Sequence, residues 1–136
     1  MMDNYVITAV YATVFGVPSV ALIRKDRPDW QAGLFNFIGG KVNDGEVPWD
    51  AAIRKCLEEA DLAVTGLEHR ETFTAWPAKV KVHLYYGVCQ NPVLLPQLTS
   101  ERPMWVPLQF VDNYPLICDI RSIVKVLGDI YVQSQT

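Results

Sequence analysis

The first third of the chain predicts two strands, a loop and a short extended segment. Residues 5–14 are rich in β-branched and aromatic side chains, and residues 19–23 form a second apolar run after a Gly-Val-Pro sequence. This pattern predicts paired strands joined by a turn. Residues 24–35 combine charges with proline and glycine, which is typical of a surface loop. Residues 36–38 are expected to be extended, before a glycine loop that runs into an acidic helix.

The middle of the chain predicts a helix followed by two strands. Pro48 suits the first turn of a helix, where its missing N–H costs little, and most residues after it favour helix, so we expect a helix over 48–60. Residues 68–76 are expected to be extended. Residues 79–88 alternate sharply, with two valines and a leucine on one face and two lysines and a histidine on the other, and predict a second strand.

The last third predicts a loop, a short strand and a packed helix. Residues 91–103 contain three prolines and are expected to form a loop before a strand at 105–106. Residues 116–131 place apolar side chains at helical spacing. Strands before, between and after two helices predict an α/β fold, an α/β/α sandwich with a mixed sheet. No repeat or linker interrupts the pattern, so residues 1–136 are expected to form a single domain.

Composition and charge limit the kind of partner. The chain has 136 residues, half of them apolar, and can bury a core without disulfides or a structural metal. A net charge of −3 gives no electrostatic reason to expect nucleic acid or a membrane as partner, although a free nucleotide is compatible with it. The three cysteines lack zinc spacing, and neither a basic leader nor an apolar run of about 18 residues is present, so we expect a soluble cytoplasmic protein.

Residues 39–62 carry the most specific motif of the sequence. A glycine pair is followed by an acidic helical segment, and counting from Gly40 gives characteristic residues at fixed distances: Glu46, Arg54, Glu58, Glu59 and Leu62. This arrangement resembles the Nudix box, whose pattern is Gly, five residues, Glu, seven residues, then Arg-Glu-aliphatic-any-Glu-Glu-any-Gly-aliphatic. The chain departs from the pattern at Lys55, where a glutamate is expected, and at Asp61, where a glycine is expected.

The resemblance implies a fold, a reaction and a set of roles. Nudix proteins are α/β/α sandwiches that hydrolyse a pyrophosphate bond with Mg²⁺ or Mn²⁺, typically in a nucleoside diphosphate linked to another group. Carried over residue by residue, Glu58 and Glu59 become metal ligands and catalytic carboxylates, Gly39 a ligand through its carbonyl, and Glu46 with Arg54 an internal ion pair. On a helix, Glu58 and Glu59 diverge by about 100°, so we expect Glu59 to converge with Glu46 and Gly39 as hard oxygen ligands.

The two departures have different consequences. Lys55 puts a positive charge where the family commonly has a metal-binding carboxylate, so affinity for a second or third metal ion should fall. Two interpretations stay open: Lys55 contacts a substrate phosphate, or it marks a weakened or inactive site. Asp61 would have to accept the left-handed conformation that glycine favours at a helix end, at some cost. That change is expected to be structural and mild.

Outside the box, the candidates are less specific. Glu101 is the first choice for a distal general base or ligand and Glu71 the second, against the alternative of an exposed loop glutamate. Arg24, Lys25 and Lys41 could hold phosphates, or the first two could belong to a charged surface turn.

Three residues before the box could bind a nucleobase. Trp30 and Phe35 could stack on a base and Asn36 could hydrogen-bond its edge, against the alternative of core packing or loop anchoring. The resulting prediction is a pyrophosphohydrolase that converts a nucleoside triphosphate, nucleotide sugar or ADP-ribose-type substrate to a nucleoside monophosphate. A nucleotide-binding or protein-interaction module without catalysis is the alternative, and RNA-end processing a third that lacks an evident basic track. A homodimer is possible, as Nudix enzymes often dimerise.

Overall fold

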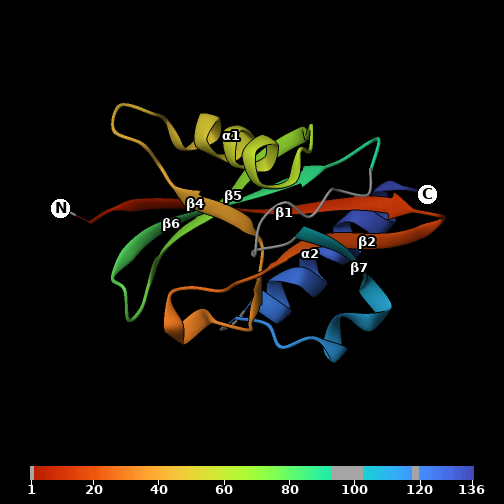
Figure 1. The fold of residues 1–136 in the computed structure, drawn as a ribbon. Coiled ribbons are helices and arrows are strands. Elements are labelled where there is room, and N and C mark those ends of the chain that lie inside the picture. Colours follow the sequence, from red (N-terminus) through yellow and green to blue (C-terminus); the bar gives the residue numbers. More distant parts are fainter. Residues whose placement is uncertain (1, 93–102, 118–119) are drawn as a thin grey trace.

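Seven strands of the described chain form one sheet, with a helix on each face (Figure 1). The structure is a computed structural model that describes residues 2–92, 103–117 and 120–136. The strands are β1 (Asn4–Val14), β2 (Val17–Arg24), β3 (Phe35–Asn36), β4 (Ile38–Lys41), β5 (Thr65–Ala75), β6 (Val80–Val88) and β7 (Pro103–Pro107). The helices are α1 (Pro48–Ala60) and α2 (Ile120–Ser134), with 3-10 turns η1 (Asp29–Gln31) and η2 (Leu108–Asn113).

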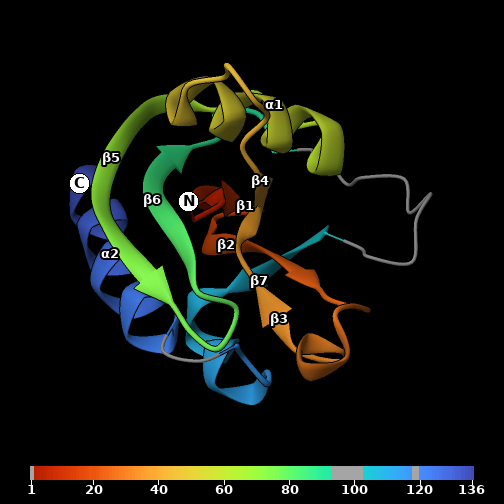
Figure 2. The ribbon, with the colours of Figure 1, turned by 90° about the vertical axis from the view of Figure 1, so that its left-hand side faces the viewer.

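The sheet is mixed and centred on β1. Its order is β3-β2-β1-β6-β5, with β4 also pairing with β1 and β7 with β2. β1 and β6 run parallel, whereas the other pairs are antiparallel. Figure 2 shows β5 and β6 curving between α1 and α2. The predicted α/β/α sandwich with a mixed sheet is therefore confirmed.

The two faces of the sheet pack differently. The α2 face holds large side chains, among them Tyr11 and Tyr131, whose rings stack with centroids 5.7 Å apart. The α1 face is built from small helix residues, since Ala51, Ala52 and Cys56 are all fully buried. Small side chains allow the helix to lie close to the strands below it. Cys56 occupies the aliphatic position of the box and packs as a small apolar group.

Helix α1 begins and ends as its sequence predicts. Pro48 lies at its first turn, and the helix spans the expected residues 48–60. Asp61 follows in the left-handed conformation, with φ 50° and ψ 37°. The N–H of Asp61 donates to the Leu57 carbonyl, and that of Leu62 to Cys56. The helix end that the family makes with glycine is therefore kept with aspartate.

Two expected boundaries were wrong. The glycines do not lie in a loop: Gly39 and Gly40 belong to β4, where they pair with Ile7 and Val6 of β1. The last helix begins at Ile120 in the described chain rather than at 116, because Leu116 forms an isolated bridge with Phe35 and cannot also be helical. Residues 93–102, most of the predicted loop, lie outside the described residues. No described helix has the length and apolar character needed to cross a membrane.

Candidate nucleotide-hydrolysis site

The glycine strand β4 and helix α1 meet at Gly39 and Glu59. The Gly39 N–H donates a hydrogen bond to Glu59 Oε1 at 3.2 Å. A Cβ at Gly39 would run into the backbone carbonyl of Val6 and the Cα of Ile7. Glycine is required there because β1 passes too close for any side chain. The hydrogen bond from the Gly39 N–H holds the Glu59 carboxylate against the β4 backbone.

Arg54 ties the helix to the loop that precedes it. Its Nε and Nη2 donate to the two oxygens of Glu46 at 2.8 and 2.9 Å, and its Nη1 donates to both oxygens of Glu58 at 2.9 and 3.0 Å. Nη2 also donates to the carbonyl of Lys41 in β4, at 3.1 Å. The side chains of Arg54 and Glu46 are only 26% and 16% exposed. One guanidinium therefore joins α1, β4 and the intervening loop.

The hydrogen bonds fix the charge state of this cluster. The Arg54 guanidinium, together with the Asn43 N–H, lowers the pKa of Glu46 from 4.5 to about 2. Bonding to Glu46 and Glu58 in turn raises the pKa of Arg54. Glu46 is thus ionised at any physiological pH. It was expected to converge with Glu59 as a possible ligand, but its two oxygens are bound by Arg54 and by the Asn43 N–H.

Lys55 lies over the second glycine. An added Cβ at Gly40 would come 2.8 Å from Lys55 Nζ and closer still to its Cε. The lysine side chain therefore occupies the space that a residue with a side chain at position 40 would fill. Lys55 and Glu59 are four residues apart on α1 and lie on the same face of the helix, towards β4. The positive charge and the carboxylate are neighbours along the glycine strand.

The donor groups suit one hard divalent ion better than a cluster of ions. Within residues 2–92, 103–117 and 120–136, no three His, Cys, Asp or Glu side chains are grouped so that they could hold a metal. Glu59, Glu58 and the Gly39 carbonyl are oxygen donors of the type that Mg²⁺ and Mn²⁺ prefer. Glu58 is exposed and bound to Arg54, so it would have to exchange that partner. These donors could hold one ion at Glu59, where the nearby Lys55 ammonium would repel further cations.

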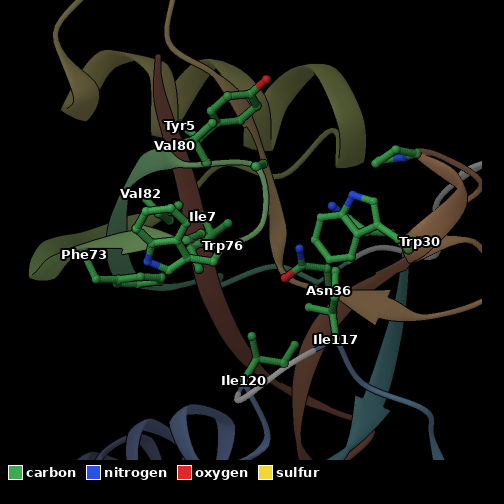
Figure 3. A pocket seen from close by; sticks show the side chains of 14 residues that line it. Tyr5, Ile7, Trp30, Asn36, Phe73, Trp76, Val80, Val82, Ile117 and Ile120 are labelled. Carbon is green, nitrogen blue, oxygen red and sulfur yellow. The ribbon is translucent and has the colours of Figure 1, made fainter. Parts of the chain in front are cut away.

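An apolar pocket of about 270 Å³ opens on the other face of β1 (Figure 3). Figure 3 shows the Trp30 and Trp76 indoles on either side of the Asn36 amide, with Phe73 farther along the wall. The full lining is Tyr5, Ile7, Pro28, Trp30, Gln31, Asn36, Phe73, Ala75, Trp76, Ala78, Val80, Val82, Ile117 and Ile120. Asn36 Oδ1 accepts the Phe37 N–H at 2.7 Å, which orients the amide. Planar walls and an oriented amide suit a nucleobase.

The pocket and the glycine strand are joined through the β1–β4 ladder. Ile7 lines the pocket and pairs with Gly39, and Tyr5 lines it and pairs with Lys41. Paired residues of antiparallel strands share a face, so Lys41 lies on the pocket side, where its Nζ is 3.6 Å from an Asp3 oxygen. A ligand in the pocket would therefore lie beside the strand that Glu59 contacts.

The structure brings some of the remaining candidates together and separates others. Phe35 does not line the pocket: it is buried in the core, with its ring edge-on to Tyr114 at 5.2 Å. Arg24 is exposed at the end of β2 and Lys25 follows it, with its N–H and carbonyl bonded to residues 33–34. Glu71 lines a groove with residues of α2, on the sheet face opposite α1. Glu101 lies outside the described residues.

Several lining residues were missed by sequence reasoning. Tyr5 and Ile7 come from β1, whereas Phe73 and Trp76 come from the end of β5 and the turn after it, so no local pattern in the sequence groups the four residues. Trp76 could have been predicted as a binding residue because it precedes a proline in a turn, where a large aromatic side chain is expected to be exposed to solvent. It is 64% exposed.

The fold and the glycine–helix site together define the Nudix class. A sequence model described as the NUDIX domain matches residues 7–119, and the chain belongs to that family. It is 32% identical to the oxidized purine nucleoside triphosphate hydrolase of Mus musculus, in a match that covers 72% of this chain and 67% of that protein.

Solved structures share the same fold. The NUDIX domain of Shewanella oneidensis NrtR, complexed with ADP ribose, is similar with a TM-score of 0.81 and 17% identity, covering 97% of this chain and 89% of that one. A C. elegans Ap4A hydrolase has a TM-score of 0.75 and 21% identity, covering 95% of this chain and 98% of that one. At these identities the likeness extends to the fold alone.

Proposed function

We propose that this Nudix protein is a Mg²⁺- or Mn²⁺-dependent pyrophosphohydrolase of a nucleoside diphosphate linked to another group. The observation that carries the proposal is the contact of Glu59 with Gly39, on a strand whose partner Ile7 lines an aromatic pocket. A base in the pocket would direct its phosphates along β4 towards a carboxylate. The product would be a nucleoside monophosphate.

The relatives support the substrate class. The mouse relative is named for hydrolysis of oxidized purine nucleoside triphosphates, one structural neighbour is an Ap4A hydrolase, and another is complexed with ADP ribose. These three ligands share a nucleoside that is esterified to a chain of phosphates, which are linked to one another by anhydride bonds. We carry over that shared chemistry and propose no narrower substrate. The net charge of −3 favours a free nucleotide over nucleic acid, and we keep a cytoplasmic location as part of the proposal.

Different residues of the chain would bind the metal ion, position its ligands and contact the phosphates. Glu59, with Glu58 and the Gly39 carbonyl, would hold the divalent ion, which supplies charge neutralisation on the phosphates and acidifies the attacking water. Arg54 would position Glu58 and keep the loop containing Glu46 against the helix. Lys41, and Arg24 with Lys25 at the end of β2, would contact phosphates. Glu101 remains the proposed distal base.

The pocket would bind the base through Trp30 and Asn36. Because the side-chain oxygen of Asn36 already accepts a hydrogen bond from the Phe37 N–H, the side-chain amide would present its NH₂ group to the base. An acceptor on the base edge, such as a keto oxygen or an unprotonated ring nitrogen, fits that donor. Phe35 supports this wall from the core and is no longer proposed to touch the substrate.

A substrate panel tests the proposal. Nucleoside triphosphates, oxidised nucleotides, ADP-ribose, dinucleoside polyphosphates and nucleotide sugars would be incubated with Mg²⁺ or Mn²⁺, and phosphate and nucleoside monophosphate release measured. We expect metal-dependent turnover of one class by the native protein, and its loss by at least 100-fold in Glu59→Gln. Asp50→Asn, an exposed acid in the first turn of α1, is the matched control and should keep the activity.

A binding module without catalysis is the second candidate, and Lys55 favours it. Its ammonium lies at the glycine strand, and the described residues form no cluster of three acidic or histidine ligands. The two candidates differ in one result. Tight nucleotide binding with no turnover above the Glu59→Gln background would reject the hydrolase and support the module.

A further inference from the structure

Among the described residues, Lys55 supplies the atoms nearest to the space beside the second glycine of β4, and its position depends on that glycine. The Nζ would lie 2.8 Å from a Cβ at residue 40, so the side chain rests in a space that exists only because Gly40 has none. Helix α1 lies close to the sheet through small buried residues such as Ala51 and Ala52, which brings Lys55 within reach of the strand. The ammonium is therefore held at the backbone where the phosphates of a nucleotide are proposed to lie.

In the described part of the chain, no acidic side chain forms an ion pair with Lys55. Arg54, one residue earlier, binds Glu46 and Glu58 and the Lys41 carbonyl. Lys55 takes no part in that network, and its influence on the pKa of Glu46 is a through-space effect weaker than that of Arg54. Arg54 is thus bound to groups of the loop and the helix, whereas Lys55 is available to bind a ligand.

We propose that Lys55 binds a substrate phosphate directly and takes the place of further divalent ions, so that the site uses a single metal ion. An ammonium offers three hydrogen-bond donors and a full positive charge, both of which suit a phosphate oxygen. The same charge repels a second divalent cation at short range. This inference rests on the proposed function for the identity of the ligand, but it makes claims about binding that do not depend on turnover.

Two consequences follow from a lysine in this role. Polyphosphate binds without any metal ion, because part of its charge is neutralised by the protein itself. The number of metal ions that the protein can hold is limited by Lys55, so that a carboxylate at position 55 adds a site. A lysine that merely covered Gly40 would give neither result.

The first test is calorimetric titration with inorganic triphosphate in EDTA at low salt, which presents the phosphate chain without a base. We expect measurable binding to the native protein and at least tenfold weaker binding to Lys55→Met. Lys81→Met is the matched control, since Lys81 is an exposed lysine on β6, and its affinity should stay within twofold of native. Equal affinities of native and Lys55→Met, or no binding to the native protein in EDTA, would overturn the inference.

The second test counts metal ions by Mn²⁺ electron paramagnetic resonance on the protein alone. We expect one bound Mn²⁺ in the native protein and an additional one in Lys55→Glu. The same number in both proteins would overturn the single-ion proposal, and circular dichroism would establish that each variant is folded. Metal-free binding through Lys55 without turnover would reject the hydrolase and keep this inference, whereas turnover with triphosphate affinity unchanged in Lys55→Met would do the reverse.

Discussion

Replacing each of the two adjacent glycines of β4 with alanine in turn should have different effects on stability. At Gly39 the new Cβ would meet the Val6 carbonyl and the Cα of Ile7, which are backbone atoms of the central strand. At Gly40 it would meet the Cε and Nζ of Lys55, the far end of a flexible side chain. The backbone of β1 is fixed by pairing on both sides, whereas the lysine can swing away.

The size of the difference can be worked from these contacts. Overpacking against fixed atoms costs about 1–3 kcal/mol, and unfolding entropy of about 2.1 cal/mol/K per residue gives about 0.29 kcal/mol/K for 136 residues. Gly39→Ala should therefore lower Tm by about 3–10 °C. Gly40→Ala removes a flexible glycine from a strand, which stabilises by about 0.5–1 kcal/mol, so its Tm should be unchanged or up to about 3 °C higher.

Thermal unfolding followed by circular dichroism measures both variants against the native protein. Triphosphate titration in EDTA gives the second readout, in which Gly40→Ala should bind more weakly because Lys55 has lost its position. A Tm loss in Gly40→Ala as large as that in Gly39→Ala would refute the reasoning. So would a Gly40→Ala protein that keeps native affinity, because Lys55 would then not need the space over Gly40.

Three further predictions concern charge, a buried hydrogen bond and a thiol. Because folding lowers the pKa of Glu46 from 4.5 to about 2, its stabilising effect is complete above pH 4.5 and disappears as the pH falls towards 2. Urea midpoints of native protein and Glu46→Gln should therefore differ at pH 7 and converge at low pH; a constant difference would contradict this. Tyr11 donates from a fully buried hydroxyl to the Val124 carbonyl at 2.9 Å, so Tyr11→Phe should cost about 1 kcal/mol, or about 3 °C in Tm; an unchanged Tm would argue against that bond. Burial raises the pKa of Cys56 to about 12, so alkylation at pH 8 mapped by mass spectrometry should spare it until the protein unfolds; rapid native labelling would show that it is accessible.

Local signals explain which parts of the fold were predictable. The helix over 48–60 was predicted correctly because its signals are local: Pro48 lies at the first turn, and most of the residues that follow favour helix. The last helix was placed too early, since the apolar spacing continues through Leu116 into a segment that instead pairs with Phe35. The spacing of apolar residues cannot show where a helix begins when the residues before it are also apolar but pair with a strand.

Long-range pairing explains which parts of the site were not predictable. The pocket depends on Tyr5 lying beside Val82 in a parallel pair, and no local pattern states that register. The position of Lys55 over Gly40 depends on how closely α1 packs on β4, which the spacing of the box does not encode. The box predicted which residues form the site, whereas strand pairing and helix packing decided which of them lie side by side.

The ladder between β1 and β4 has an evolutionary consequence. Ile7 and Tyr5, which line the pocket, are the pairing partners of Gly39 and Lys41, so a change of register there would disturb the pocket and the glycine strand at once. Trp30 and Trp76, on the walls of the pocket, are not part of this pairing: Trp30 comes from η1 and Trp76 from the turn after β5. New ligand preferences can therefore arise by exchange of wall residues in connecting segments while the paired strands, and the chemistry they carry, are inherited intact.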